Sequence, residues 1–149
     1  MKPVETRLPG CRVLEPKVFS DERGSFYETW NQQAFSELGL DLEFKQANVS
    51  SSSRGILRGL HYQWAKSQGK LVHVLDGKVY DIAVNIRQDS STYGCWASAI
   101  LSAENKRQMW IPPGFVTLSE RATFISNCMM PNAMPTCAGM MLGWPLTGP

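Results

Sequence analysis

The sequence predicts an all-β fold, a sandwich or a barrel with one or two short helices. Up to about residue 125 the chain contains many short apolar and polar alternations, separated by turn residues. Residues 31–38 are the best candidate for a short helix. A chain of 149 residues has the length of one domain and can bury a core without disulfides or metals.

The strongest strand signal surrounds Asp76-Gly77. Alternating runs at 70–75 and 78–87 flank this dipeptide, and that pattern predicts a β-hairpin. In the second run the polar side chains share one face. The opposite face carries Tyr80, Ile82, Val84 and Ile86. Further strands are predicted at 97–101, 108–111 and 122–126.

The composition argues against several classes of protein. A net charge of +2 is too small to indicate binding to nucleic acid or to a membrane surface. Every apolar run is too short to span a bilayer, and the first residues carry no apolar signal segment, so we expect a cytoplasmic protein. The four cysteines have neither close pairing nor a CxxC motif, which favours reduced thiols over disulfides or zinc.

The segment from Gly55 to Gly77 resembles the metal motif of cupins with its ligands replaced. His61 holds the place of the first histidine, Gln63 that of the second, and Lys70 that of the glutamate. An ammonium group repels a divalent metal, so the sequence predicts no metal. An imidazole beside a cation instead suits removal of a proton next to a carbonyl group.

Six blocks, taken in order, resemble the dTDP-4-dehydrorhamnose 3,5-epimerase family. They are Asp-Glu-Arg-Gly at 21–24, Gln-Ala-Asn at 46–48, Leu-Arg-Gly-Leu-His-Tyr-Gln at 57–63, Gln-Gly-Lys-Leu at 68–71, Leu-Ser-Ala-Glu-Asn-Lys-Arg-Gln at 101–108 and Ile-Pro-Pro-Gly-Phe at 111–115. The resemblance implies a cupin-type jelly-roll barrel, a homodimer, no cofactor, and a role in making dTDP-L-rhamnose for cell-surface polysaccharide. The implied substrate is a dTDP-linked 4-keto-6-deoxyhexose, which is epimerised at C3 and C5.

The resemblance also implies residue roles. His61 is the implied base, and Lys70 stabilises the enolate oxygen that forms when the proton leaves. The implied substrate-binding residues are Arg23 and Arg58 on the diphosphate, with Glu28, Gln46 and Asn48 at further nucleotide contacts. Asp81 has two open interpretations, a partner for a nearby base or an ordinary hydrogen bond inside the barrel.

The chain departs from the family in three places. About four residues are missing after Gly114-Phe115, including a family histidine, and Thr117 stands where the second cupin motif has its histidine. Ser126 stands in place of the family's tyrosine acid, and a serine hydroxyl is a much weaker acid than a phenol. The family's last glutamate and its Arg-Trp-Asp-Asp segment are not visible. We therefore expect this copy to be impaired.

The last residues differ from the rest in composition. Residues 1–126 are predicted to form one epimerase-like domain, and residues 127–149 an atypical tail that holds five of the seven methionines. Cys137-Ala-Gly-Met-Met141 can be encoded by TGC GCT GGG ATG ATG, which read from its third base gives Arg-Trp-Asp-Asp. A frame-shift from about residue 126 is thus favoured over drift in a degenerate paralogue. Sequencing the coding DNA tests this, because other codons would exclude it.

Three alternative functions remain open at this point. The first alternative is a homologue that binds dTDP-sugars but catalyses no reaction. The second is a one-centre epimerase or a 4-keto sugar isomerase. The third alternative, a metal-dependent cupin, is disfavoured by Gln63, Lys70 and Thr117 in place of ligands.

Overall fold

The computed structural model describes residues 1–63 and 66–130, with side chains up to residue 120. These residues form ten strands and one short helix. The elements are β1 (Lys2–Glu5), β2 (Arg12–Glu15), β3 (Val18–Asp21), β4 (Gly24–Tyr27), α1 (Gln32–Glu37), β5 (Gln46–Ser52), β6 (Leu57–His61), β7 (Lys70–Asn85), β8 (Trp96–Ser102), β9 (Gln108–Ile111) and β10 (Phe115–Met130).

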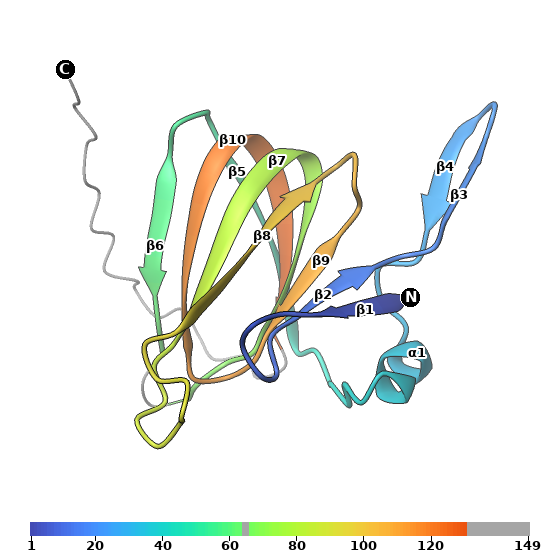
Figure 1. The fold of residues 1–149 in the computed structure, drawn as a ribbon. Helices are drawn as coiled ribbons and strands as arrows, with labels where there is room; N and C mark the ends of the chain where they lie inside the picture. Colours follow the sequence, from blue (N-terminus) through green and yellow to red (C-terminus); the bar gives the residue numbers. More distant parts are fainter. Residues whose placement is uncertain (64–65, 131–149) are drawn as a thin grey trace.

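Two long strands, β7 and β10, hold the barrel together (Figure 1). They pair with each other in antiparallel fashion along most of their length. The first half of β7 also pairs with β9 and its second half with β8, while the first half of β10 pairs with β6 and its second half with β5. The larger wall of the barrel consists of β1, β2, β9, the first half of β7, the second half of β10 and β5. The smaller wall consists of β8, the second half of β7, the first half of β10 and β6. The predicted all-β class is confirmed.

The hairpin predicted around Asp76-Gly77 is wrong. The chain continues through this dipeptide as one strand, β7, in which Gly77 has a φ of 76°. The pairing register with β10 shifts opposite this point, between Arg121 and Phe124. Both halves of β7 find a common partner in β10, so the glycine provides a bend at which the strand passes from one wall of the barrel to the other.

The remaining predicted elements are confirmed with adjusted ends. Residues 97–101 lie inside β8, residues 108–111 are β9, and residues 122–126 lie inside β10, which begins earlier, at Phe115. The predicted helix at 31–38 contains α1, and Asn31 caps it by accepting a hydrogen bond from the Ala34 backbone at 3.0 Å.

Apolar side chains pack on both sides of the larger wall. Inside the barrel the core consists of Leu8, Cys11, Val74, Val79, Ala83, Ala97, Leu101, Met109, Ile111 and Phe115. Outside, α1 covers a second cluster made of Leu14, Phe35, Leu40, Leu71 and Trp110. Burial raises the pKa of the Cys11 thiol to about 12, so this cysteine is a protonated core residue.

The polar face of the second half of β7 is the one that turns into the barrel. Asp81 is 1% exposed and Asn85 is fully buried, whereas Tyr80 on the opposite face is 37% exposed. The barrel therefore encloses polar groups, as a binding cavity requires. In the described part of the chain, no helix is long and apolar enough to cross a membrane.

Buried His73 predicts a loss of stability in acid. Its side chain is 3% exposed, and burial lowers its pKa below the ordinary value of 6.5. Below that value the unfolded chain binds a proton that the folded chain does not, so this histidine makes the free energy of unfolding fall as the pH drops below about 6.5. Urea unfolding at pH 7.5 and 5.5 measures this, and the difference between the two pH values should be smaller in His73→Gln. An equal difference in both proteins contradicts the prediction.

Candidate active site

His61 and Lys70 meet through Thr117 inside the barrel. Thr117 on β10 is the register partner of His61 at the end of β6, so the two side chains share one face of neighbouring strands. Lys70 begins β7 and donates a hydrogen bond from Nζ to Thr117 Oγ1 at 3.0 Å. Thr117 is 6% exposed, while His61 and Lys70 are half-buried. The structure thus brings the two predicted chemical residues together.

A second polar row lies beside the first on the same face. Arg58 of β6 is the register partner of Ser119 on β10, which in turn is the partner of Asp81 on β7. Ser119 Oγ donates to Asp81 Oδ1 at 2.5 Å. Arg58 donates from Nη2 to the Ser51 carbonyl oxygen at 3.2 Å, so its guanidinium group is held near the start of this row. The bond to Ser119 supports the interpretation of Asp81 as a residue that lines the barrel.

Gln46 and Asn48 face the same interior from β5. The register places Asn48, Cys128 and Val72 in one row, and Val72 packs against the interior core. Gln46 lies two residues earlier on the same face, and its Nε2 donates to Asn48 Oδ1 at 3.0 Å. Five of the seven predicted site residues are therefore on the inner wall of one barrel.

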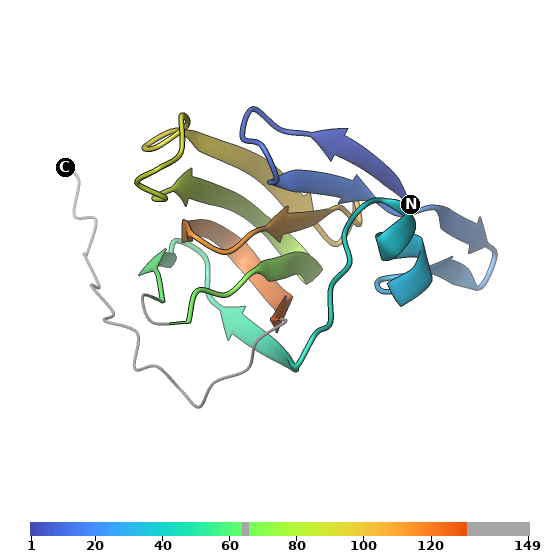
Figure 2. The ribbon, with the colours of Figure 1, turned by 90° about the horizontal axis from the view of Figure 1, so that it is seen from below.

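Arg23 and Glu28 are not part of this group. The strands β3 and β4 form a separate two-stranded sheet that projects from the side of the barrel opposite β6 (Figures 1 and 2). Arg23 lies in its turn, with 90% of its side chain exposed, and it forms an ion pair with Asp21 at 2.5 Å. Glu28 follows β4 and accepts a hydrogen bond from Asn31 at 3.1 Å. Within one chain these two residues do not reach the barrel interior.

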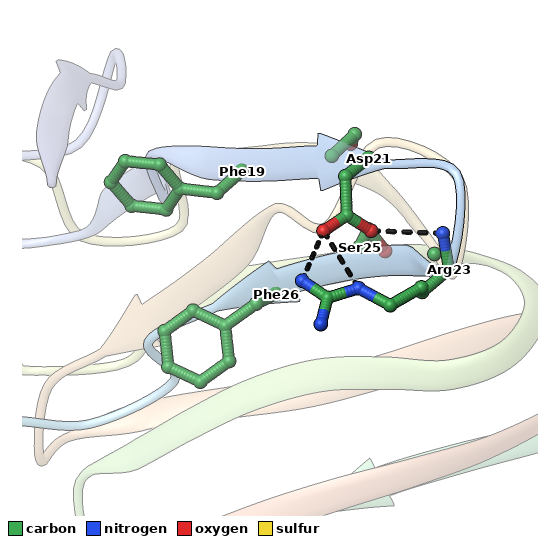
Figure 3. Close-up of a pocket in the computed structure, with 7 residues that line it drawn as sticks. Phe19, Asp21, Arg23, Ser25 and Phe26 are labelled. Carbon is green, nitrogen blue, oxygen red and sulfur yellow. Dashed lines mark hydrogen bonds and ion pairs between the residues drawn. The ribbon is translucent and has the colours of Figure 1, made fainter.

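The hairpin of β3 and β4 has a surface hollow of its own. Its residues line an open hollow that includes Arg23 and the cross-strand pair Phe19 and Phe26, whose side chains are 54% and 72% exposed (Figure 3). The Arg23 guanidinium group lowers the pKa of Asp21, which keeps the carboxylate charged and the turn closed. A hollow on a lone hairpin is too open to enclose a ligand by itself.

The sequence did not predict the hydroxyl groups that bind Lys70 and Asp81 inside the barrel. In the sequence Thr117 is only a replacement for a histidine, and no motif marks Ser119. Their one visible signal is the two-residue spacing that places both hydroxyl groups on the same face of a strand. The residues described contain no group of three or more histidine, cysteine, aspartate or glutamate side chains placed to hold a metal ion.

Thr117 and Ser126, two of the replacements on which the predicted impairment rests, differ in what the structure shows of them. Thr117 takes part in the site through Lys70. The backbone of Ser126 pairs with Ser50 of β5 and with Val74 of β7. The strand β10 continues to Met130, and the rest of the predicted atypical tail, 131–149, lies outside the described residues.

Comparisons with known proteins agree with one another. A family model described as dTDP-4-dehydrorhamnose 3,5-epimerase matches residues 5–139. A protein named dTDP-4-dehydrorhamnose 3,5-epimerase from Salmonella typhimurium is 53% identical over 128 residues, which cover 82% of this chain and 70% of that protein.

Solved structures of such proteins have the same fold. A Legionella pneumophila dTDP-6-deoxy-D-glucose-3,5-epimerase in complex with dTDP-4-keto-L-rhamnose superposes with a TM-score of 0.86 at 43% identity, covering 89% of this chain and 72% of that one. A Bacillus anthracis dTDP-4-dehydrorhamnose 3,5-epimerase with TDP and PPi bound gives 0.87 at 34% identity, covering 99% and 92%. The predicted cupin-type jelly roll is confirmed.

Proposed function

Because this chain belongs to the dTDP-4-dehydrorhamnose 3,5-epimerase family, a family of isomerases, we propose that its barrel binds a dTDP-linked 4-keto-6-deoxyhexose and removes a proton next to the ketone. The observation that carries the proposal is the convergence of His61 and Lys70 on Thr117 inside the barrel. Sequence similarity alone does not require that these two side chains meet; the fold brings them together from strands that are distant in the chain.

The chemistry needs a base and a cation at these positions. C3 and C5 of the sugar both flank the C4 ketone, so loss of either proton gives an enolate whose charge rests on the C4 oxygen. His61 accepts the proton from carbon, and the Lys70 ammonium stabilises the oxygen while it is negative. A proton then returns to the same carbon, on the other face if the centre is to be inverted. Proton removal and return balance by themselves, without an oxidant or reductant.

The nucleotide is proposed to lie along the inner wall. Arg58 contacts the diphosphate, for which a guanidinium group offers a paired donor geometry, while Gln46 and Asn48 offer amide groups farther along the wall. The bond between Gln46 and Asn48 orients both side chains before a ligand arrives. In this arrangement the sugar lies towards His61 and the nucleotide towards β5.

This copy is proposed to exchange protons better than it inverts centres. Inversion needs an acid on the face opposite the base, and Ser126 stands where the family has a tyrosine. The same substitution favours a second candidate function, a homologue that binds dTDP-sugars without chemistry. Residues 1–126 form the proposed functional domain, because every residue assigned a role lies within them.

Proton exchange into the sugar tests the proposal. The protein is incubated with dTDP-4-dehydro-6-deoxy-D-glucose in deuterated water, and C3 and C5 are followed by NMR. Deuterium at either carbon is the expected result, and inversion at one carbon alone identifies a one-centre epimerase. A folded sample that binds dTDP but exchanges neither proton supports the binding homologue and contradicts the epimerase.

The position of Arg23 and Glu28 supports a homodimer as the working form. Both lie on or beside the projecting hairpin, away from the barrel interior of their own chain (Figure 1). If Arg23 binds a diphosphate, that diphosphate is in the barrel of a second copy. The exposed phenyl rings of Phe19 and Phe26 on this hairpin are then covered by the partner.

Removing the Arg23 side chain is therefore expected to weaken dTDP binding by about tenfold or more, since a charge-assisted hydrogen bond to phosphate is lost. Isothermal titration with dTDP measures the effect, and Arg7→Ala, another exposed arginine, is the matched control.

Sedimentation equilibrium is expected to give a dimer. Mixing Arg23→Ala with His61→Ala chains restores exchange in mixed dimers, because one site keeps both residues. A monomer whose dTDP affinity is unchanged by Arg23→Ala contradicts the arrangement.

A further inference from the structure

Two hydroxyl groups on β10 each hold an ionisable side chain in the barrel interior. Thr117 Oγ1 accepts a hydrogen bond from Lys70 Nζ at 3.0 Å, and Ser119 Oγ donates to Asp81 Oδ1 at 2.5 Å. The two residues are spaced by two along the strand, so they share the interior face. The sequence motifs assign a role to Lys70 and none to the group that holds it.

The contact between Lys70 and Thr117 joins the two walls of the barrel. Lys70 lies in the half of β7 that pairs with β9, and Thr117 lies in the half of β10 that pairs with β6. A lysine side chain has a flexible four-carbon stem and loses much rotamer entropy when its ammonium group is held in one place. The buried hydroxyl group limits this freedom and holds the ammonium group at the side of the smaller wall.

The chemical nature of the partner matters for Lys70. A threonine oxygen accepts a hydrogen bond from one of the three N–H groups of the ammonium and carries no negative charge. The positive charge therefore remains available to an oxygen that becomes negative, and two N–H groups remain to bind it. A carboxylate at the same place would hold the lysine equally well but would offset its charge.

Thr117 also determines which group lies beside the ammonium. It is the direct register partner of His61, and paired residues on adjacent antiparallel strands have Cβ atoms about 5 Å apart. Holding Lys70 on Thr117 therefore holds it beside His61. A base and a cation separated in this way suit a substrate whose acidic carbon and carbonyl oxygen are neighbouring atoms.

We infer that Thr117 is a positioning residue, whose hydroxyl group holds the Lys70 ammonium beside His61 so that it faces the oxygen of the enolate. The inference rests on the proposed function. Thr117 acts through Lys70 rather than by touching the reacting atoms. The position is thus more than the site of an absent histidine, because the hydroxyl group has its own part in the arrangement.

The test compares Thr117→Val, which removes the hydroxyl group at nearly constant shape, with Thr117→Ser, which keeps it. Thr92→Val is the matched control, because Thr92 is another part-buried threonine whose hydroxyl group bonds Asn85 and Ser90 away from Lys70. We expect Thr117→Val to lower the kcat of deuterium exchange by about tenfold with little change in dTDP affinity. Thr117→Ser should restore most of that rate, and Thr92→Val should not lower it.

A second readout does not depend on activity. The ¹³C relaxation of the Lys70 Cε methylene group, assigned with Lys70→Arg, reports how ordered the side chain is. The order parameter is expected to fall in Thr117→Val and to stay near the parent value in Thr117→Ser and Thr92→Val. If the parent protein exchanges no proton, the proposed function fails, while this measurement still decides whether the Thr117 hydroxyl group holds Lys70. An unchanged Lys70 order parameter in Thr117→Val overturns it, and so does an equal loss of kcat in Thr92→Val.

Discussion

Replacement of His61 by alanine is expected to reduce deuterium incorporation at C3 and C5 by about 10²- to 10⁴-fold, the usual contribution of a general base. His61 is the one histidine on the interior face, and it lies beside the residue that holds Lys70. Without the imidazole, water must accept the proton, and the enolate forms much more slowly. Affinity for dTDP should change little, because the proposed nucleotide contacts come from other residues.

His73→Gln is the matched control for this experiment. His73 lies on the opposite face of β7 from Lys70, where its register partner is Gln108, and it is 3% exposed. Its replacement should lower stability slightly while leaving exchange in place. A His61→Ala protein that exchanges at the parent rate would remove His61 from the mechanism. A His73→Gln protein that loses exchange while folded would show that the assignment of the two histidines is reversed.

Replacement of Phe35 by alanine is expected to lower the free energy of unfolding by about 3–5 kcal/mol. Phe35 is the buried residue of α1, with its ring centroid 4.4 Å from that of Trp30, and it shares a cluster with Leu14 and Leu71. The helix has only six residues, too few to be stable alone, so its attachment to the larger wall depends on this ring. The loss of the ring leaves a cavity that the short helix fills poorly.

Urea denaturation at fixed protein concentration measures this loss, since the proposed dimer would make apparent stability depend on concentration. Gln33→Ala in the same helix is the matched control, because Gln33 is exposed and its replacement should change the free energy of unfolding by less than about 0.5 kcal/mol. Phe35→Leu should lie between the two. Equal stability of Phe35→Ala and Gln33→Ala would mean that α1 does not hold the outer cluster together.

Local pattern predicted several elements well. The strand at 108–111 and the helix within 31–38 lie where the sequence predicts them, and the structure shows that Asn31 caps this helix. The faces of the second half of β7 were also predicted correctly, because alternation follows directly from the geometry of an extended chain.

Alternation does not say which face is buried. In β7 the large apolar side chains of Tyr80, Ile82 and Val84 face outwards, and the face with Asp81 and Asn85 faces inwards. The error at Asp76-Gly77 has a related cause. The glycine specifies a positive φ, and whether this makes a hairpin or a bend depends on which strands pair on either side.

The candidate site shows the same division. The family resemblance pointed to His61, Lys70, Arg58, Gln46 and Asn48, and the register places all five on one inner wall. The resemblance equally pointed to Arg23 and Glu28, which lie on or beside a separate hairpin. A motif gives the type and order of residues, and it does not record which of them lie close together in the folded chain.

The fold class and the family therefore follow from the sequence, and the resemblance that it carries is the source of the proposed site residues. These depend on residue type and spacing, which are properties of a linear chain. Only the tertiary structure decided that β7 bends instead of turning back, that its polar face is the inner one, and that Thr117 holds Lys70 beside His61. Each of these depends on pairing between strands that are distant in sequence, and the free energy of such pairing comes from burial and hydrogen bonds that form only when the whole barrel closes.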